Sequence, residues 1–229
     1  MAEKSSVKLL GSSPSPFVNR VQIALNLKSI DYEYIEETFL PKSELLLKSN
    51  PVHKKIPVMF HEDKPICESL VIVQYIDDKW TSGPTILPTE PYDRAIARFW
   101  SAYLDDKLFP YLREYCITAP EEEKPAKFEK IKEGLVLLEE TFMKTSKGKT
   151  YFGGENIGYL DISFGSFLGW MKAGEKMMNV KFLEESTTPN LVLWADCFLS
   201  HEAVKGVIPE PDVLVEMAKK IAVLAKSQT

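Results

Sequence analysis

The chain has 229 residues, of which 45% are hydrophobic and 27% charged, the profile of an ordinary soluble globular protein of one or two domains. Its 28 basic and 33 acidic residues give a net charge of −5, which argues against nucleic-acid binding because phosphate recognition needs a basic face. No apolar run approaches the roughly 20 residues that span a bilayer. The start of the chain shows no signal-peptide pattern, so we expect a cytoplasmic protein without a membrane partner.

The cysteine and histidine residues give no sign of metal chemistry. The 3 cysteines are too few and too scattered for a disulfide framework, and the 3 histidines lack the spacing of metal ligands. We therefore predict no metal site and no permanently bound cofactor.

The first third of the chain alternates strand patterns with helical patterns. Strand patterns cover residues 7–10, 32–35, 58–60 and 65–67, the last two on either side of a polar turn. Helical patterns cover the segment that begins at Ser15-Pro16, residues 41–48, and the apolar series Leu70, Val73, Ile76 and Trp80. The order β-α-β-α-β-β-α indicates a small mixed sheet covered by helices, an α/β domain at residues 5–83.

The rest of the chain is predicted to be all-helical. A proline-rich linker at residues 84–91 precedes it, and we place the second domain at residues 92–229. Helical patterns cover Tyr92–Cys116, Glu121–Lys144, Tyr159–Met178, Pro189–Ser200 and Asp212–Lys226.

Three loops of the first domain lie at element ends that could converge on one side of the sheet. Ser15 stands as a helix N-cap before Pro16, and a simple cap is its ordinary explanation. Pro57 begins a strand, where a trans bond is commoner, although a cis bond would leave the Ile56 backbone free to pair with an extended peptide. Glu68-Ser69 begins a helix, whose free amides either are capped or bind a carboxylate.

Four segments together resemble the plant tau-class glutathione transferases. They are the sequences SPFVNRV at Ser15–Val21, NPVHKKIPV at Asn50–Val58, PICES at Pro65–Ser69 and VQYID at Val73–Asp77. The resemblance runs along nearly the whole chain. It implies a thioredoxin-like N-terminal domain that binds glutathione as co-substrate, an all-helical C-terminal domain, and a homodimer.

The resemblance also implies residue roles. Ser15 corresponds to the catalytic hydroxyl, and the glutathione-binding set is Lys42, Lys55, Ile56, Glu68 and Ser69. A pocket for the hydrophobic substrate would be lined by Ser12, Phe17, Phe109, Arg113, Trp170 and Met217, although plain core packing explains the aromatic and Met residues equally well. Pro57 and Asp161 have structural roles; Asp161 supplies half of a capping box whose usual Ser or Thr is Gly158.

The expected function is conjugation of the glutathione thiolate to hydrophobic electrophiles, as in detoxification and stress responses, with hydroperoxide reduction as an additional activity. A non-catalytic carrier of hydrophobic ligands is the alternative, and a thiol oxidoreductase is a third hypothesis. Serine at position 15, where thiol-transferase relatives carry cysteine, argues against the third. Ser12 and Ser13 replace an aromatic pair that the family often has, which predicts a wider and more polar pocket beside the sulfur.

Overall fold

The computed structural model describes residues 6–38 and 40–226. Residues 1–5, on which the expectation about a signal peptide rests, lie outside the described residues. The chain forms two compact units. Unit 1 contains the chain up to Leu87 together with Glu202–Ile208, and unit 2 contains Pro88–His201 and the chain from Pro209 onward.

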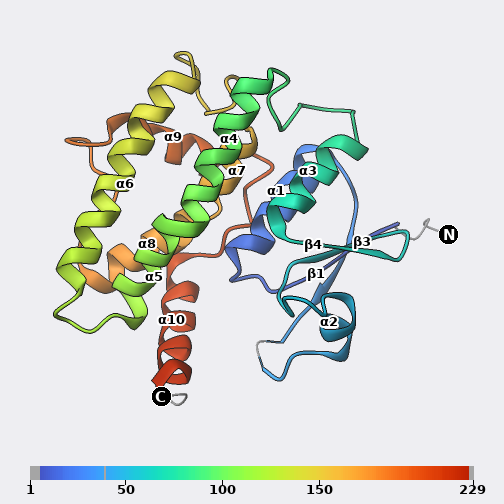
Figure 1. Cartoon of the computed structure of the whole chain (residues 1–229), viewed down its shortest axis with the longest axis horizontal. Coiled ribbons are helices and arrows are strands. Elements are labelled where there is room, and N and C mark those ends of the chain that lie inside the picture. The colour runs from blue at the N-terminus through green and yellow to red at the C-terminus, as the bar shows by residue number, and fades with distance from the viewer. Residues whose placement is uncertain (1–5, 39, 227–229) are drawn as a thin grey trace. The chain divides into compact units, whose positions relative to one another are not determined.

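In the described part of the chain, four strands form the mixed sheet of unit 1 (Figure 1). Their order is β2-β1-β3-β4, with β2 parallel to β1 and the other neighbours antiparallel. The strands are β1 (Val7–Gly11), β2 (Glu33–Glu36), β3 (Val58–His61) and β4 (Lys64–Cys67). The sequence patterns therefore identified each strand to within a residue or two, and the sheet is the expected thioredoxin-like one.

Three helices cover this sheet, with α1 and α3 on one side and α2 on the other (Figure 1). They are α1 (Pro16–Leu27), α2 (Glu44–Ser49) and α3 (Ser69–Lys79). Helix α1 buries most of its side chains, and Gly11 lets it begin close to the sheet, since a Cβ at Gly11 would lie 2.6 Å from Val18 Cγ1. A buried ion pair of 2.8 Å between Lys28 Nζ and Asp77 Oδ1 joins the C-terminal ends of α1 and α3.

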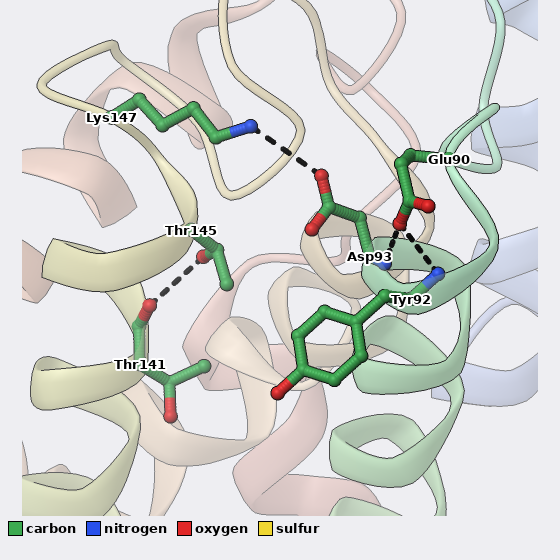
Figure 2. A network of polar contacts seen from close by, with 6 residues as sticks. All are labelled: Glu90, Tyr92, Asp93, Thr141, Thr145 and Lys147. Atoms are coloured by element: carbon green, nitrogen blue, oxygen red, sulfur yellow. Dashed lines mark hydrogen bonds and ion pairs between the residues drawn. The ribbon is translucent and has the colours of Figure 1, made fainter.

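Unit 2 is helical. Its elements are α4 (Pro91–Tyr103), η1 (Leu104–Leu108), α5 (Phe109–Arg113), η2 (Glu114–Thr118), α6 (Lys124–Thr145), α7 (Tyr159–Gly165), α8 (Leu168–Met178), α9 (Pro189–Ser200) and α10 (Pro211–Lys226). Figure 2 shows the start of α4, where the Glu90 carboxylate accepts hydrogen bonds from the amides of Tyr92 and Asp93. Within the described ranges, no helix has both the length and the apolar character needed to cross a membrane.

The structure differs from the predicted helices in two places. The segment expected to be one helix over Tyr92–Cys116 is interrupted by the π-helical turns η1 and η2, which flank α5. The segment expected over Tyr159–Met178 is two helices, α7 and α8. Helix α7 ends at Gly165, where the Phe198 ring packs so closely that any Cβ would overlap it. A periodic pattern reports neither the extra residue of a π-helical turn nor the close approach of a ring from another helix.

The core of unit 2 is organised around the fully buried carboxylate of Asp161. It accepts hydrogen bonds from the amides of Phe152, Gly153 and Gly158 and from the Trp194 indole N–H, at 2.7–2.9 Å. The bond from the Gly158 amide is the half of the capping box that the sequence predicts. Burial raises the pKa of Asp161 to about 6, while the four donors oppose that rise and keep the carboxylate ionised at neutral pH.

We predict that Asp161→Asn lowers the free energy of unfolding by at least about 3 kcal/mol, because an amide NH₂ would face N–H donors that now meet a charged acceptor. Asp93→Asn is the matched control. Its carboxylate forms a half-exposed pair with Lys147 at 3.4 Å (Figure 2), and exposed pairs contribute less than about 1 kcal/mol. Urea unfolding measures both changes, and equal losses in the two variants would contradict the structural role of Asp161.

Candidate functional site

The sheet register brings the loops of unit 1 to one end of the sheet. Leu10 lies opposite Val58 and also opposite Ile35, and Val58 lies opposite Cys67. The segments that follow β1, β2 and β4 therefore leave the sheet at one end, and the segment that precedes β3 enters the sheet at that same end. They carry Ser15, Lys42, Glu68-Ser69 and Ile56, respectively. The predicted convergence of these loops is confirmed by the register.

Ser15 occupies the N-cap position of α1. Its Oγ accepts a long hydrogen bond of 3.4 Å from the amide of Val18, and its own amide donates to the carbonyl of Ser12 at 2.9 Å. Because the hydroxyl oxygen serves as an acceptor here, the hydroxyl hydrogen remains available to a ligand above the helix N-terminus. The side chain is half-buried.

The loop before β3 is held by Asn50, whose side chain is buried. Its Nδ2 donates to the carbonyl of Lys55 at 2.9 Å, and its Oδ1 accepts from the amide of His53 at 3.1 Å. Lys54 adopts a positive φ of 53° inside this loop, and the Ile56–Pro57 bond is cis. The ladder of β3 begins at Val58, so the backbone of Ile56 precedes the first ladder pair.

Lys42 lies on the segment between β2 and α2. Its ammonium donates to the carbonyl of Lys54 at 2.8 Å, which places it beside the loop that Asn50 holds. The buried carboxylate of Glu37 fixes the same segment by accepting from the amide of Ser43 at 2.9 Å and from its hydroxyl at 2.5 Å. Lys42 and Lys55 are exposed, so both charges face solvent at this end of the sheet.

Glu68 and Ser69 form the start of α3. Glu68 has a φ of 70° and a ψ of 115°, a sparsely populated conformation that costs energy for a residue with a side chain; strained residues of this kind cluster at binding and catalytic sites. Its carboxylate lies 3.9 Å from His53 Nε2. The Ser69 hydroxyl is buried and accepts a hydrogen bond from the guanidinium of Arg20 at 3.2 Å, which joins the start of α3 to α1.

Cys67 is the cysteine nearest to these residues. Burial raises the pKa of its thiol, and the negative charge of Glu68 raises it further. The thiol donates to the carbonyl of Ser49 at 3.6 Å. A neutral, hydrogen-bonded thiol is a poor nucleophile, so Cys67 serves the packing of the strand end.

The residues predicted to line a hydrophobic pocket divide between the two units. In unit 1, Ser12 is half-buried, and Phe17 is 38% exposed with the Arg20 guanidinium 5.1 Å from its ring centre. In unit 2, Phe109 is buried and its ring stacks on that of Phe167, as a core side chain does. Arg113 is exposed, whereas Trp170 on α8 and Met217 on α10 are half-buried. Helices α8 and α10 pack against each other.

Sequence reasoning missed three residues that hold this site together, namely Asn50, Glu37 and Arg20. Asn50 stood inside the recognised motif, and its position before a proline-containing loop was the available signal. Glu37 and Arg20 are buried charges, which no local pattern distinguishes from solvent-exposed ones. Among the residues that the structure describes, no group of three or more His, Cys, Asp or Glu side chains is arranged to hold a metal ion.

The chain is similar to known proteins of one family. Residues 5–78 match the family described as glutathione S-transferase, N-terminal domain. The chain is 56% identical over 218 residues to Glutathione S-transferase U17 of Arabidopsis thaliana, covering 95% of this chain and 96% of the relative. A tau class glutathione S-transferase from mango (Mangifera indica) superimposes with a TM-score of 0.91 at 60% identity, covering 94% of this chain and 98% of that one. A rice glutathione S-transferase in complex with glutathione has a TM-score of 0.85 at 34% identity, covering 98% and 100%.

We predict that Asn50→Ala loosens the loop between α2 and β3, because both of its anchoring hydrogen bonds disappear. Amide hydrogen exchange of residues 53–56 should become at least about tenfold faster than in the parent, a change of roughly 1.4 kcal/mol in local stability. The exposed Asn156 offers a matched control, and Asn156→Ala should leave exchange in that loop unchanged. Parent-like exchange in Asn50→Ala would show that the loop is held by other contacts.

Proposed function

The chain belongs to the tau class of the glutathione S-transferases, and on that basis we infer that it is an enzyme that conjugates the glutathione thiolate to hydrophobic electrophiles. Glutathione is its co-substrate. The observation that carries the proposal is the strand register, which gathers a hydroxyl, two lysines, a backbone segment just before the β3 ladder and a helix N-terminus at one end of the sheet. A small peptide with two carboxylates and one amine requires such a set of groups.

Ser15 is proposed as the group that stabilises the thiolate. A free thiol with a pKa near 8.5 is mostly protonated at neutral pH, and lowering that pKa by about two units requires about 2.7 kcal/mol. A hydrogen bond to a charged group contributes about 1.5–3 kcal/mol, and a helix N-terminus about 0.3–1 kcal/mol. The Ser15 hydroxyl at the N-cap of α1 therefore suffices without a general base.

The other binding residues match the charges of the peptide. Lys42 and Lys55 are proposed to meet the glycyl carboxylate end, because exposed ammonium groups attract carboxylates in an otherwise acidic chain. The backbone of Ile56 would pair with the cysteinyl unit in the manner of an added strand. Glu68 and Ser69 would hold the amine and carboxylate of the γ-glutamyl unit, a role that the unusual φ of Glu68 supports.

The electrophile is proposed to meet Ser12 and Phe17 on the sulfur side of unit 1. Hydroperoxide reduction is a second proposed activity of the same thiolate. A thiol-exchange activity is disfavoured because the raised pKa of Cys67 leaves this part of the site without a reactive cysteine. We propose a role in detoxification in the cytoplasm, where a pool of reduced glutathione is maintained.

We also propose a homodimer. Helix α4 exposes Tyr92 and Phe99, seven residues apart on one face, to 70% and 61%. Helix α6 adds the exposed Met143 at 55%. Exposed aromatic side chains at helical spacing favour a protein partner, and a second copy of the chain is the partner that the family resemblance implies.

Ser15→Ala should lower kcat for conjugation of an aryl halide by about one to three orders of magnitude, because the hydroxyl stabilises the ionised sulfur of the bound thiol. The pKa of the bound thiol should rise toward its free value, so activity should recover as the pH increases. This shift is measured by the pH profile of kcat/KM for the electrophile at saturating glutathione, where the enzyme already holds the thiol. Ser13→Ala, which removes an exposed hydroxyl from the same loop, should keep the parent profile. An unshifted profile in Ser15→Ala rejects Ser15 as the activating group.

Phe99→Asp should dissociate the dimer, because it places a charge in the proposed apolar contact. Light scattering should give twice 26.0 kDa for the parent and 26.0 kDa for the variant. Leu193→Asp is the control, since Leu193 is equally exposed at 67% but lies on α9. A parent that is monomeric at micromolar concentration contradicts the proposal.

A further inference from the structure

A segment from late in the chain lies against α1. We call this segment, Glu202–Ile208, the strap; it connects α9 to α10 and belongs to unit 1 (Figure 1). Two asparagines of α1, seven residues apart, hold it by its backbone. Asn19 Nδ2 donates to the carbonyl of Val207 at 3.2 Å, and Asn26 Nδ2 donates to the carbonyl of Ala203 at 3.0 Å.

The two asparagines differ in one respect. Asn19, which is 1% exposed, also lies within hydrogen-bond distance of the carbonyl of Ser13, at 3.2 Å, and of Gln22 Oε1, at 3.3 Å. Its amide therefore joins the strap to the loop that leads into Ser15. Asn26, seven residues further along α1, holds the strap at Ala203.

The loop between β1 and α1 is short, so a hydrogen bond at its middle controls its end. The amide of Ser15 donates to the carbonyl of Ser12, which closes the turn, and the Asn19 amide fixes the carbonyl of Ser13 within it. The amide of Asn19 itself donates to the carbonyl of Ser15 at 3.0 Å. Asn19 thus contacts the loop at Ser13 and at Ser15, on either side of Pro14.

We propose that Asn19 is a positioning residue for the reaction: by joining the carbonyl of Ser13 to the carbonyl of Val207, it sets the place of the Ser15 hydroxyl and makes that place depend on the strap. This inference rests on the proposed role of Ser15. The hydroxyl must meet the sulfur within about 0.5 Å of the productive geometry to stabilise the thiolate. The side chain that anchors its loop therefore affects the pKa of the bound thiol without touching glutathione.

The test compares Asn19→Ala with Asn26→Ala. Asn19→Ala should raise the pKa of the bound thiol by about one unit and lower kcat at neutral pH about tenfold, with KM for glutathione within about twofold of the parent. Asn26→Ala removes the other bond to the strap and should leave the pH profile of kcat/KM unchanged. Thermal unfolding of both variants reports the loss of stability, which a merely structural role would produce in both.

A double variant separates this inference from the proposed function. In the Ser15→Ala background, adding Asn19→Ala should cause no further shift of the profile, because Asn19 acts only through Ser15. A further shift there, or an unshifted profile in Asn19→Ala when Ser15→Ala does shift it, overturns the inference and leaves the proposed function standing. An unshifted profile in Ser15→Ala itself rejects both.

A second substitution covers the case in which Asn19→Ala does not fold. Asn19→Gln keeps the amide but moves it by one methylene, so the hydrogen bonds to the carbonyls of Ser13 and Val207 should weaken. The pKa of the bound thiol should therefore rise, as in Asn19→Ala. A folded Asn19→Gln with the parent pH profile would overturn the inference.

Discussion

The start of α1 is the constraint on which unit 1 depends. Pro16 has no amide to donate and Ser15 caps the helix, so the helix begins at one definite residue. Gly11 admits that first turn close to the sheet, and the buried Lys28–Asp77 pair joins the far end of α1 to α3. With both ends determined, the Ser15 hydroxyl is presented at the end of the sheet where the other loops leave it.

Much of this unit could be predicted from local sequence. Alternating apolar residues identified the strands, and the Ser15-Pro16 pair identified the start of α1, because caps and prolines act on their immediate neighbours. The sequence alone does not determine the isomer of the Ile56–Pro57 bond, because cis and trans both fit the same residues; the structure has it cis. Asn50 and Glu37 went unnoticed because their importance lies in which carbonyls and amides they meet after folding.

Unit 2 shows which features of the helices hydrophobic periodicity does not predict. The pattern over Tyr92–Cys116 is continuously amphipathic, yet the helix there contains two π-helical turns, which insert a residue into the hydrogen-bond ladder without changing the polarity of the sequence. At Gly165, where α7 ends, the close contact is with the Phe198 ring, 33 positions further along the chain. Asp161 was identified only as half of a capping box, whereas its bonds to Phe152, Gly153 and Trp194 make it a tertiary junction.

The strap has a consequence for how the molecule is made. Unit 1 is complete only when Glu202–Ile208 reaches α1, although all its other residues come before Pro88. During synthesis, the face of α1 that carries Asn19 and Asn26 therefore stays uncovered by the strap while the ribosome adds more than a hundred residues after Leu87, at about 5–20 residues per second. The nascent sheet domain spends that interval with an unfinished side, and the loop before Ser15 lacks its hydrogen-bonded link through Asn19 to Val207 until that segment has been made.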